Sequence, residues 1–93
     1  MNYEWDAAKA RYNIGKHKVT FEEAATVFLD PLAITFDDPD HSLSERRFIT
    51  IGWSSQRRVL FVAHAERGID RIRIITARKA TRREQHDYSE IRR

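Results

Sequence analysis

The spacing of apolar residues changes along the chain, from a helical period near the N-terminus to strand-like alternation in the middle. The first helical segment covers residues 7–14, with Asp6 placed to cap its start and Gly15 placed to end it. Trp5, Ala8 and Tyr12 form an apolar stripe, so this side is expected to pack on the core. A polar side of the same helix, which by default would be solvated, carries Lys9, Asn13, Lys16 and His17.

Two further helices are indicated by capping boxes, in which a Thr is followed three residues later by a Glu. The two pairs with this spacing are Thr20 with Glu23, and Thr81 with Glu84. The first pair opens a segment over 21–29 with apolar residues at helical spacing, and Asp30 should end it because a residue before proline disfavours the helical conformation. The second pair opens a final helix over 82–91.

Between the second and third helices, four segments alternate or are continuously apolar, as strands do. They cover residues 32–36, 46–53, 59–65 and 70–77. Their connections are short, which favours an antiparallel meander. The two central segments are apolar on both faces, so we expect helices to cover both sides of the sheet. The pattern therefore predicts one α+β domain over 1–93, with two N-terminal helices, a four-stranded antiparallel sheet and a C-terminal helix.

The net charge of +3 conceals an uneven distribution of charge. Residues 19–45 contain seven acids and no Lys or Arg, whereas residues 67–93 contain nine basic residues and four acids. Thirteen of the 17 basic residues are arginine, the side chain best suited to bidentate phosphate binding. The arginines favour a nucleic-acid ligand, although an acidic half could also hold the basic half within the molecule.

Several classes of function are excluded or disfavoured. The chain has no cysteine, no apolar run long enough to span a membrane and no secretory signal, which together favour a cytoplasmic location. Its three glycines do not cluster, so no phosphate loop or dinucleotide motif exists and no cofactor is expected. The four histidines are dispersed, and no metal site is expected. The acids of 37–41 could hold a cation, but this stretch is equally a good turn sequence.

RNA cleavage is the chemistry that these residue types suit best. The 2′-hydroxyl of RNA can attack the adjacent phosphate, so the protein would supply only a base, an acid and cations. Candidates for proton transfer are Glu45, His64, His86 and Tyr88. Candidates for phosphate binding are Arg71, Arg73, Arg78 and Arg82.

Each candidate also has a purely structural interpretation. Arg71 and Arg73 alternate with isoleucines and could be the solvent side of a strand. Strict alternation puts Arg78 on the isoleucine side, where a buried arginine needs an acidic partner or a pocket. His64 could be a core histidine, and Tyr88 could simply pack at helical spacing.

Three longer motifs resemble the BrnT family of type II toxin–antitoxin ribonucleases, and the likeness spans nearly the whole chain. The first is W-D-x-x-K-A-x-x-N-x-x-K-H at residues 5–17. The second is V-x-F-x-E-A-x-x-V-F-x-D-P at 19–31, and the third is I-I-x-A-R at 74–78.

This resemblance implies a RelE-like fold and a metal-independent endoribonuclease that blocks translation. It implies neutralisation by a BrnA-type antitoxin with a ribbon-helix-helix domain, in a heterotetramer that binds operator DNA through the antitoxin. Trp53 is a candidate for the antitoxin surface. The residues that it favours as catalytic are Glu45, Arg71, Arg73, Arg78 and Tyr88. Lys16 and His17 of the first motif come next, and together with Lys9 and Arg82 they are the residues expected to bind substrate. The alternative is a non-catalytic binding module that contributes only to operator binding.

Overall fold

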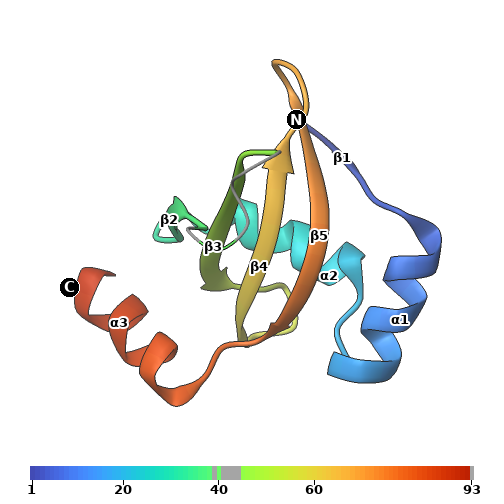
Figure 1. Ribbon diagram of the computed structural model, residues 1–93. Helices are drawn as coiled ribbons and strands as arrows, with labels where there is room; N and C mark the ends of the chain where they lie inside the picture. Colours follow the sequence, from blue (N-terminus) through green and yellow to red (C-terminus); the bar gives the residue numbers. More distant parts are fainter. Residues whose placement is uncertain (39, 41–44, 93) are drawn as a thin grey trace.

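The protein is described by a computed structural model that covers residues 1–38, 40 and 45–92, so residues 39 and 41 of the acidic stretch at 37–41, and residues 42–44 after it, lie outside the described residues. The chain begins with a strand and then forms two helices, a short 3-10 helix, four strands and a last helix (Figure 1). In order, these are β1 (Asn2–Glu4), α1 (Ala7–His17), α2 (Phe21–Thr26), η1 (Val27–Leu29), β2 (Ile34–Asp37), β3 (Arg47–Trp53), β4 (Val59–Glu66), β5 (Arg71–Lys79) and α3 (Arg82–Arg92).

The sheet has five strands in the order β1-β5-β4-β3-β2. Strands β2 to β5 form the predicted antiparallel meander, but β1 pairs in parallel with β5 and makes the sheet mixed. The expectation of two N-terminal helices and a purely antiparallel four-stranded sheet was therefore wrong. Strand β1 has only three residues, which is too short for alternation to be visible, and its pairing partner lies some 70 positions away in the sequence.

The helix starts agree with the capping signals. Asp6 accepts a hydrogen bond from the Lys9 amide, Thr20 from the Glu23 amide and Thr81 from the Glu84 amide. One difference concerns Gly15, which was expected to end α1. The helix continues to His17 and ends at Lys18, whose left-handed backbone (φ 60°) closes the last turn by donating to the Ile14 carbonyl. Gly15 is therefore an interior residue of α1 and does not terminate it.

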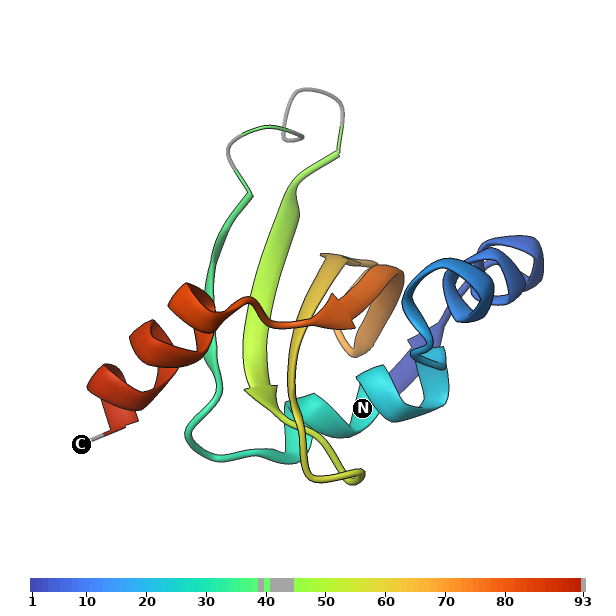
Figure 2. The same ribbon diagram turned by 90° about the horizontal axis from the view of Figure 1, so that it is seen from below.

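The two faces of the sheet have different covers (Figures 1 and 2). The face that we call the helix face packs on α1 and α2, and its core contains Phe21, Leu60, Val62, Ile72 and Ile74 among others. The face that we call the open face carries a smaller apolar cluster under α3, formed by Ile49, Ile51 and Tyr88 with partly buried neighbours. In Figure 1, α1 lies beside the β5 edge and α3 lies beside β2 and β3, so among the described residues no helix covers part of the open face over β4 and β5.

Helix α1 is rotated relative to the expectation. Ala8 and Tyr12 of the expected apolar stripe are exposed, whereas Asn13 of the expected solvated side is buried at 4% exposure. The Asn13 amide nitrogen donates to the carbonyls of Val19 and Ala77, and its oxygen accepts from the Ala77 amide. The Asn13 side chain thus makes the hydrogen bonds that a neighbouring strand would make to the edge of β5, at a position past the end of β1. Trp5 of the expected stripe and Ala10 do pack against the core, so the orientation of α1 combines this apolar contact with the hydrogen bonds of Asn13.

Candidate nucleic-acid interface

A β-bulge in β5 decides where the arginines of this strand point. Ile74 pairs with His64 and Thr76 pairs with Ala63, so Ile75 is an extra residue without a partner on β4. Beyond the bulge the alternation is reversed, and Arg78 lies opposite Phe61 on the open face. Strict alternation had placed Arg78 on the isoleucine side, and that expectation was wrong because the bulge cannot be read from alternation.

Because of the bulge, arginines lie on the open face at two levels along the strands, a pair at one level and Arg78 at the other, and we call these levels the arginine rows. In one row, Arg73 and Arg47 flank Ala65, and in the other Arg78 lies beside Phe61. Ala65 and Phe61 are four residues apart on β4, so the rows are separated by roughly 13 Å. The two rows are therefore suited to different phosphates of one nucleic-acid strand rather than to a single phosphate.

Arg78 is held in a defined orientation. Its guanidinium makes a bidentate ion pair with Glu84, at 2.8 and 3.0 Å, and lies 3.8 Å from the centre of the Phe61 ring. The hydrogen bonds from Arg78 and the Thr81 amide, with the nearby positive charge, hold the pKa of Glu84 below its ordinary value, so this carboxylate stays ionised. Arg78 was expected on physical grounds to need an acidic partner or a pocket. The structure supplies an acidic partner, Glu84 of α3.

The other predicted arginines of β5 are paired more loosely. Glu4 of β1 lies 3.4 Å from Arg71 and 3.5 Å from Arg73, with all three side chains partly exposed. Such exposed pairs contribute little to stability and exchange readily for another anion. Strand β1, which the sequence pattern did not predict, thus places a carboxylate beside the two arginines.

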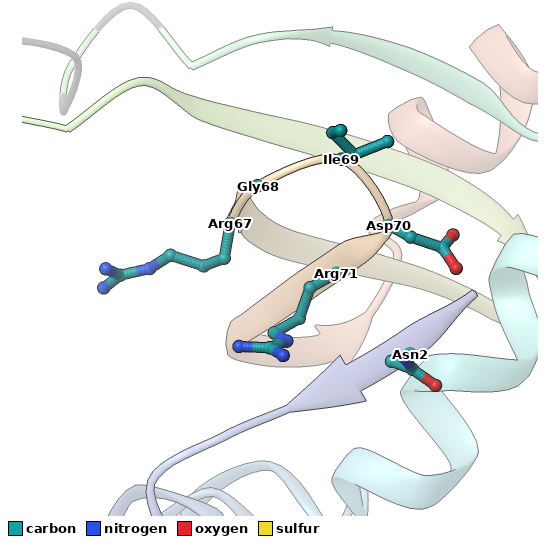
Figure 3. Close-up of a pocket in the computed structure, with 6 residues that line it drawn as sticks. All are labelled: Asn2, Arg67, Gly68, Ile69, Asp70 and Arg71. Atoms are coloured by element: carbon teal, nitrogen blue, oxygen red, sulfur yellow. The ribbon is translucent and has the colours of Figure 1, made fainter.

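Glu45 lies at the far end of the sheet from Arg78, where it pairs with Arg67 at 3.0 Å. Arg67 and Arg71 also line a cavity of about 340 Å³ at the turn between β4 and β5. Figure 3 shows both arginines extending from one side of this turn and Asp70 from the other. Asp70 pairs with the N-terminal amine at 3.7 Å. The structure therefore brings Glu45 close to Arg67 and places it at the opposite end of the arginine rows from Arg78.

A second cavity of about 340 Å³ lies between α1 and the bulged part of β5. It is lined by Ala8, Lys9, Tyr12, Asn13, Lys16, His17, Ile75 and Thr76. Burial, with added contributions from Lys16 and Arg78, lowers the pKa of His17 below its ordinary value. His17 is therefore neutral at pH 7 and able to accept a proton. Lys9, Lys16 and His17 thus meet in one place, beside the strand that carries Arg73 and Arg78.

Tyr88 and Arg82 of α3 have different surroundings. Tyr88 is 2% exposed, packs against Ile49 and Ile51, and donates its hydroxyl proton to Asp30 at 2.5 Å. The same carboxylate accepts from the Trp53 amide, so Asp30 joins α3 to the end of β3. In this conformation the Tyr88 hydroxyl fixes α3 on the sheet. Arg82 is exposed in the first turn of α3.

His64 is a core residue on the helix face. Its ring lies between Phe28 and Phe48, and its Nε2 shares a hydrogen bond of 2.7 Å with the Thr50 hydroxyl. Its Nδ1 is buried and makes no hydrogen bond within the described part of the chain. Burial lowers the pKa of His64 to about 4, so the ring is neutral at pH 7. The structural interpretation of this histidine is the correct one.

The burial of His64 makes the stability of the protein depend on pH. The unfolded chain binds a proton near pH 6.5 and the folded chain only near pH 4, so the free energy of unfolding falls as pH drops through this window. From pH 7 to pH 5 we expect a loss of about 2 kcal/mol, at about 1.4 kcal/mol per pH unit below 6.5. Urea unfolding at the two pH values measures it. His64→Gln should remove most of this dependence, and an unchanged dependence in that variant would show that other groups cause it.

Four residues that contribute to this region were not singled out from the sequence. Arg47 shares the side of its strand with Ile49 and Ile51, which indicated burial rather than a site. Glu4 belongs to the unrecognised strand, and Tyr12 was assigned to the core. Glu84 was recognised only as a capping residue, although its spacing of six from Arg78 was visible.

Within the described residues, His, Asp and Glu side chains form no group of three or more that could hold a metal ion. The same part of the chain contains no helix that is long and apolar enough to cross a membrane.

Comparisons with known proteins agree with this geometry. A family model described as "Ribonuclease toxin, BrnT, of type II toxin-antitoxin system" matches residues 5–84. The crystal structure of the Brucella abortus ribonuclease toxin BrnT superimposes with a TM-score of 0.68, covering 88% of this chain and 99% of that one. The two sequences are 23% identical, so this likeness concerns the fold. No curated protein sequence matches the chain significantly.

Proposed function

Since the chain belongs to the BrnT family of ribonuclease toxins of type II toxin–antitoxin systems, we propose that it is a metal-independent endoribonuclease that arrests translation by cutting RNA on the open face. The observation that carries this proposal is the bulge at Ile75, which puts Arg73 and Arg78 on one face of β5, the strand whose bulged part lies beside the lysines of α1. Cations along one side of the sheet match the regular charges of an RNA backbone.

Arg78 is the proposed ligand of the phosphate that is cut. Three of its five N–H groups are engaged, because Nη1 donates to Glu84 and the Lys79 carbonyl and Nη2 donates once to Glu84. The two others, on Nε and Nη2, lie on the same edge of the guanidinium and form a second fork. A fork of this kind suits two phosphate oxygens. Glu84 and Phe61 thus orient Arg78 without using the edge that phosphate would take.

Arg73, Arg71 and Arg47 are proposed to bind neighbouring phosphates, with Arg82 at the α3 end of the same path. The weak pairs of Arg71 and Arg73 with Glu4 suit this role, because a phosphate can replace a carboxylate at 3.4 to 3.5 Å with little loss of stability. Arg47 has a buried Nε that makes no hydrogen bond within the described chain, so it has an unused donor in this row.

Proton transfer is proposed to involve His17, because its lowered pKa favours the neutral ring, the form that can accept the 2′-hydroxyl proton at pH 7. Its closeness to Arg78 contributes to this shift and supports the assignment. Glu45 and Tyr88 are the other candidates for acid–base roles. Glu45 would first have to leave Arg67, and Tyr88 would have to leave Asp30.

A type II toxin is neutralised by a protein antitoxin, and the proposed partner is a BrnA-type protein with a ribbon-helix-helix domain. An acidic segment of that partner would cover the arginine rows by charge complementarity. Trp53 is 46% exposed near exposed Leu29, at a different part of the surface, and offers an apolar anchor for the same partner. The resulting heterotetramer would bind operator DNA through the antitoxin.

The proposal is tested by incubating the purified protein with RNA in EDTA and, separately, in Mg²⁺. Attack by the 2′-hydroxyl predicts equal cleavage in both buffers, products with 5′-hydroxyl ends, and no cutting at a 2′-deoxy position. Cleavage that EDTA abolishes would contradict the metal-free mechanism. Salt-dependent RNA binding without any cleavage would instead support a non-catalytic binding module.

A further inference from the structure

The cavity between α1 and β5 combines an exposed aromatic ring with positive charge. Tyr12 is 63% exposed, and the Lys16 ammonium lies 5.7 Å from the centre of its ring. Lys9 adds a second positive charge to the lining, and His17 adds a polar ring. An exposed aromatic ring beside cations is the combination that proteins use to bind single-stranded nucleic acid, because the ring stacks on a base and the cations hold its phosphate.

The floor of the cavity adds hydrogen-bonding groups. Strand β1 pairs with β5 only as far as Arg73, and Asn13 takes over at Ala77. The stretch between them, Ile75 and Thr76, is the part of β5 that lines the cavity. A base placed on Tyr12 would therefore face a strand edge and the Thr76 hydroxyl, which offer donors and acceptors to the edge of the base.

In this arrangement the residues of the motif at 5–17 have two separate roles. Its Asn13 is occupied by four hydrogen bonds with Val19, Thr76 and Ala77, and holds α1 against the sheet. Its Lys9, Lys16 and His17 face the cavity. Between them lies Tyr12, outside the fixed positions of the motif and without a packing role in the core.

From these observations we infer that the α1–β5 cavity is a nucleotide subsite, in which one base of single-stranded RNA stacks on Tyr12 and its phosphate binds Lys9 and Lys16. A cavity of about 340 Å³ is of the size that holds small ligands. Thr76 of the lining lies two residues before Arg78 on the same face of β5, so the subsite would select the base next to the phosphate that is cut. The inference rests on the proposed function only in taking RNA as the ligand.

Binding is tested apart from cleavage with a fully 2′-O-methylated single-stranded RNA, which lacks the attacking hydroxyl. Tyr12→Ala should raise its Kd about tenfold, in keeping with the contribution of one stacked base, whereas Tyr12→Phe should bind like the wild type. A matched control is Ile14→Ala, since Ile14 is exposed on the same helix but does not line the cavity. Tyr12→Ala should leave the affinity for a fully abasic strand unchanged.

Several outcomes would overturn the subsite. One is equal Kd values for wild type and Tyr12→Ala on the methylated RNA. Another is an equal loss of affinity for the abasic strand, which would show that Tyr12 does not hold a base. Equal binding of a matching duplex would also count against it, because a paired base cannot stack on the ring. If the tenfold effect appears but no RNA is cut, the subsite stands and the proposed ribonuclease function fails.

A cleavage assay supplies the complementary result. On a long RNA, Tyr12→Ala should change the distribution of cut positions by weakening the preference for the base beside the cut. An unchanged distribution, with cleavage retained, would overturn the subsite and leave the proposed function standing.

Discussion

Arg78→Ala is expected to slow RNA cleavage about 100-fold, the usual effect of removing one group that stabilises charge in a transition state. The loss should appear in kcat, because the other arginines continue to attract the RNA. A matched control is Arg46→Ala, which removes the same charge from an exposed side chain paired with Asp37 on the far side of the sheet. Single-turnover cleavage of one RNA by both variants measures the difference. Equal rates for Arg78→Ala and Arg46→Ala would remove Arg78 from the site.

Arg78→Lys should lose nearly as much activity as Arg78→Ala, although the charge is kept. A lysine has one ammonium group and cannot pair with both Glu84 oxygens while presenting a second fork to phosphate. Recovery of activity in the lysine variant would show that charge alone is needed.

Glu84→Gln separates orientation from charge at the same position. Glutamine can still form the capping box with Thr81, so α3 should keep its start, but the bidentate ion pair with Arg78 is lost. We expect kcat to fall by a smaller factor than in Arg78→Ala and the affinity for uncut RNA to remain. Faster cleavage would mean that Glu84 competes with phosphate for Arg78, the opposite of the positioning role.

Asn13→Ala is expected to lower the free energy of unfolding by about 3 kcal/mol, since three backbone groups lose their partner at about 1 kcal/mol each. These groups are the carbonyls of Val19 and Ala77 and the amide of Ala77. For a chain of this length such a loss lowers Tm on the order of 15 °C. Urea and thermal unfolding at pH 7 measure it.

Two variants test the cause of this loss. Thr76→Val removes only the long hydrogen bond of 3.3 Å to the Asn13 oxygen and should cost less than about 1 kcal/mol. Asn13→Asp should be at least as damaging as alanine, because a carboxylate cannot donate to the two carbonyls. If Asn13→Ala costs no more than Thr76→Val, water from the adjacent cavity replaces the amide.

The elements that the sequence predicted well are those with local signals. The Thr20 and Thr81 caps, the Asp30-Pro31 stop and the four antiparallel strands each depend on residues within a few positions of one another. The features that it missed depend on distant partners. Strand β1 forms because the edge of β5 offers backbone groups for it to pair with. The side chain of Asn13 in α1 points inward because the same edge continues to Ala77, whose amide it accepts from.

The candidate site shows the same division. Residue types alone indicated phosphate chemistry and drew attention to Arg78 as an arginine that needed a partner. They did not reveal that partner, because the face of Arg78 depends on one unpaired residue in β5. Lys9, Lys16 and His17 were recognised as a motif, but only folding shows that they line one cavity with Tyr12.

The two outer strands have a consequence for how the protein behaves at high concentration. Unpaired strand edges are templates on which other chains can add, which leads to aggregation. Here the outer strands have only three and four residues. The nine-residue β5 would be the more dangerous edge, but β1 covers its beginning and the Asn13 amide occupies Ala77. Loss of this amide should therefore make the chain prone to form fibrils or precipitate, beyond its effect on stability.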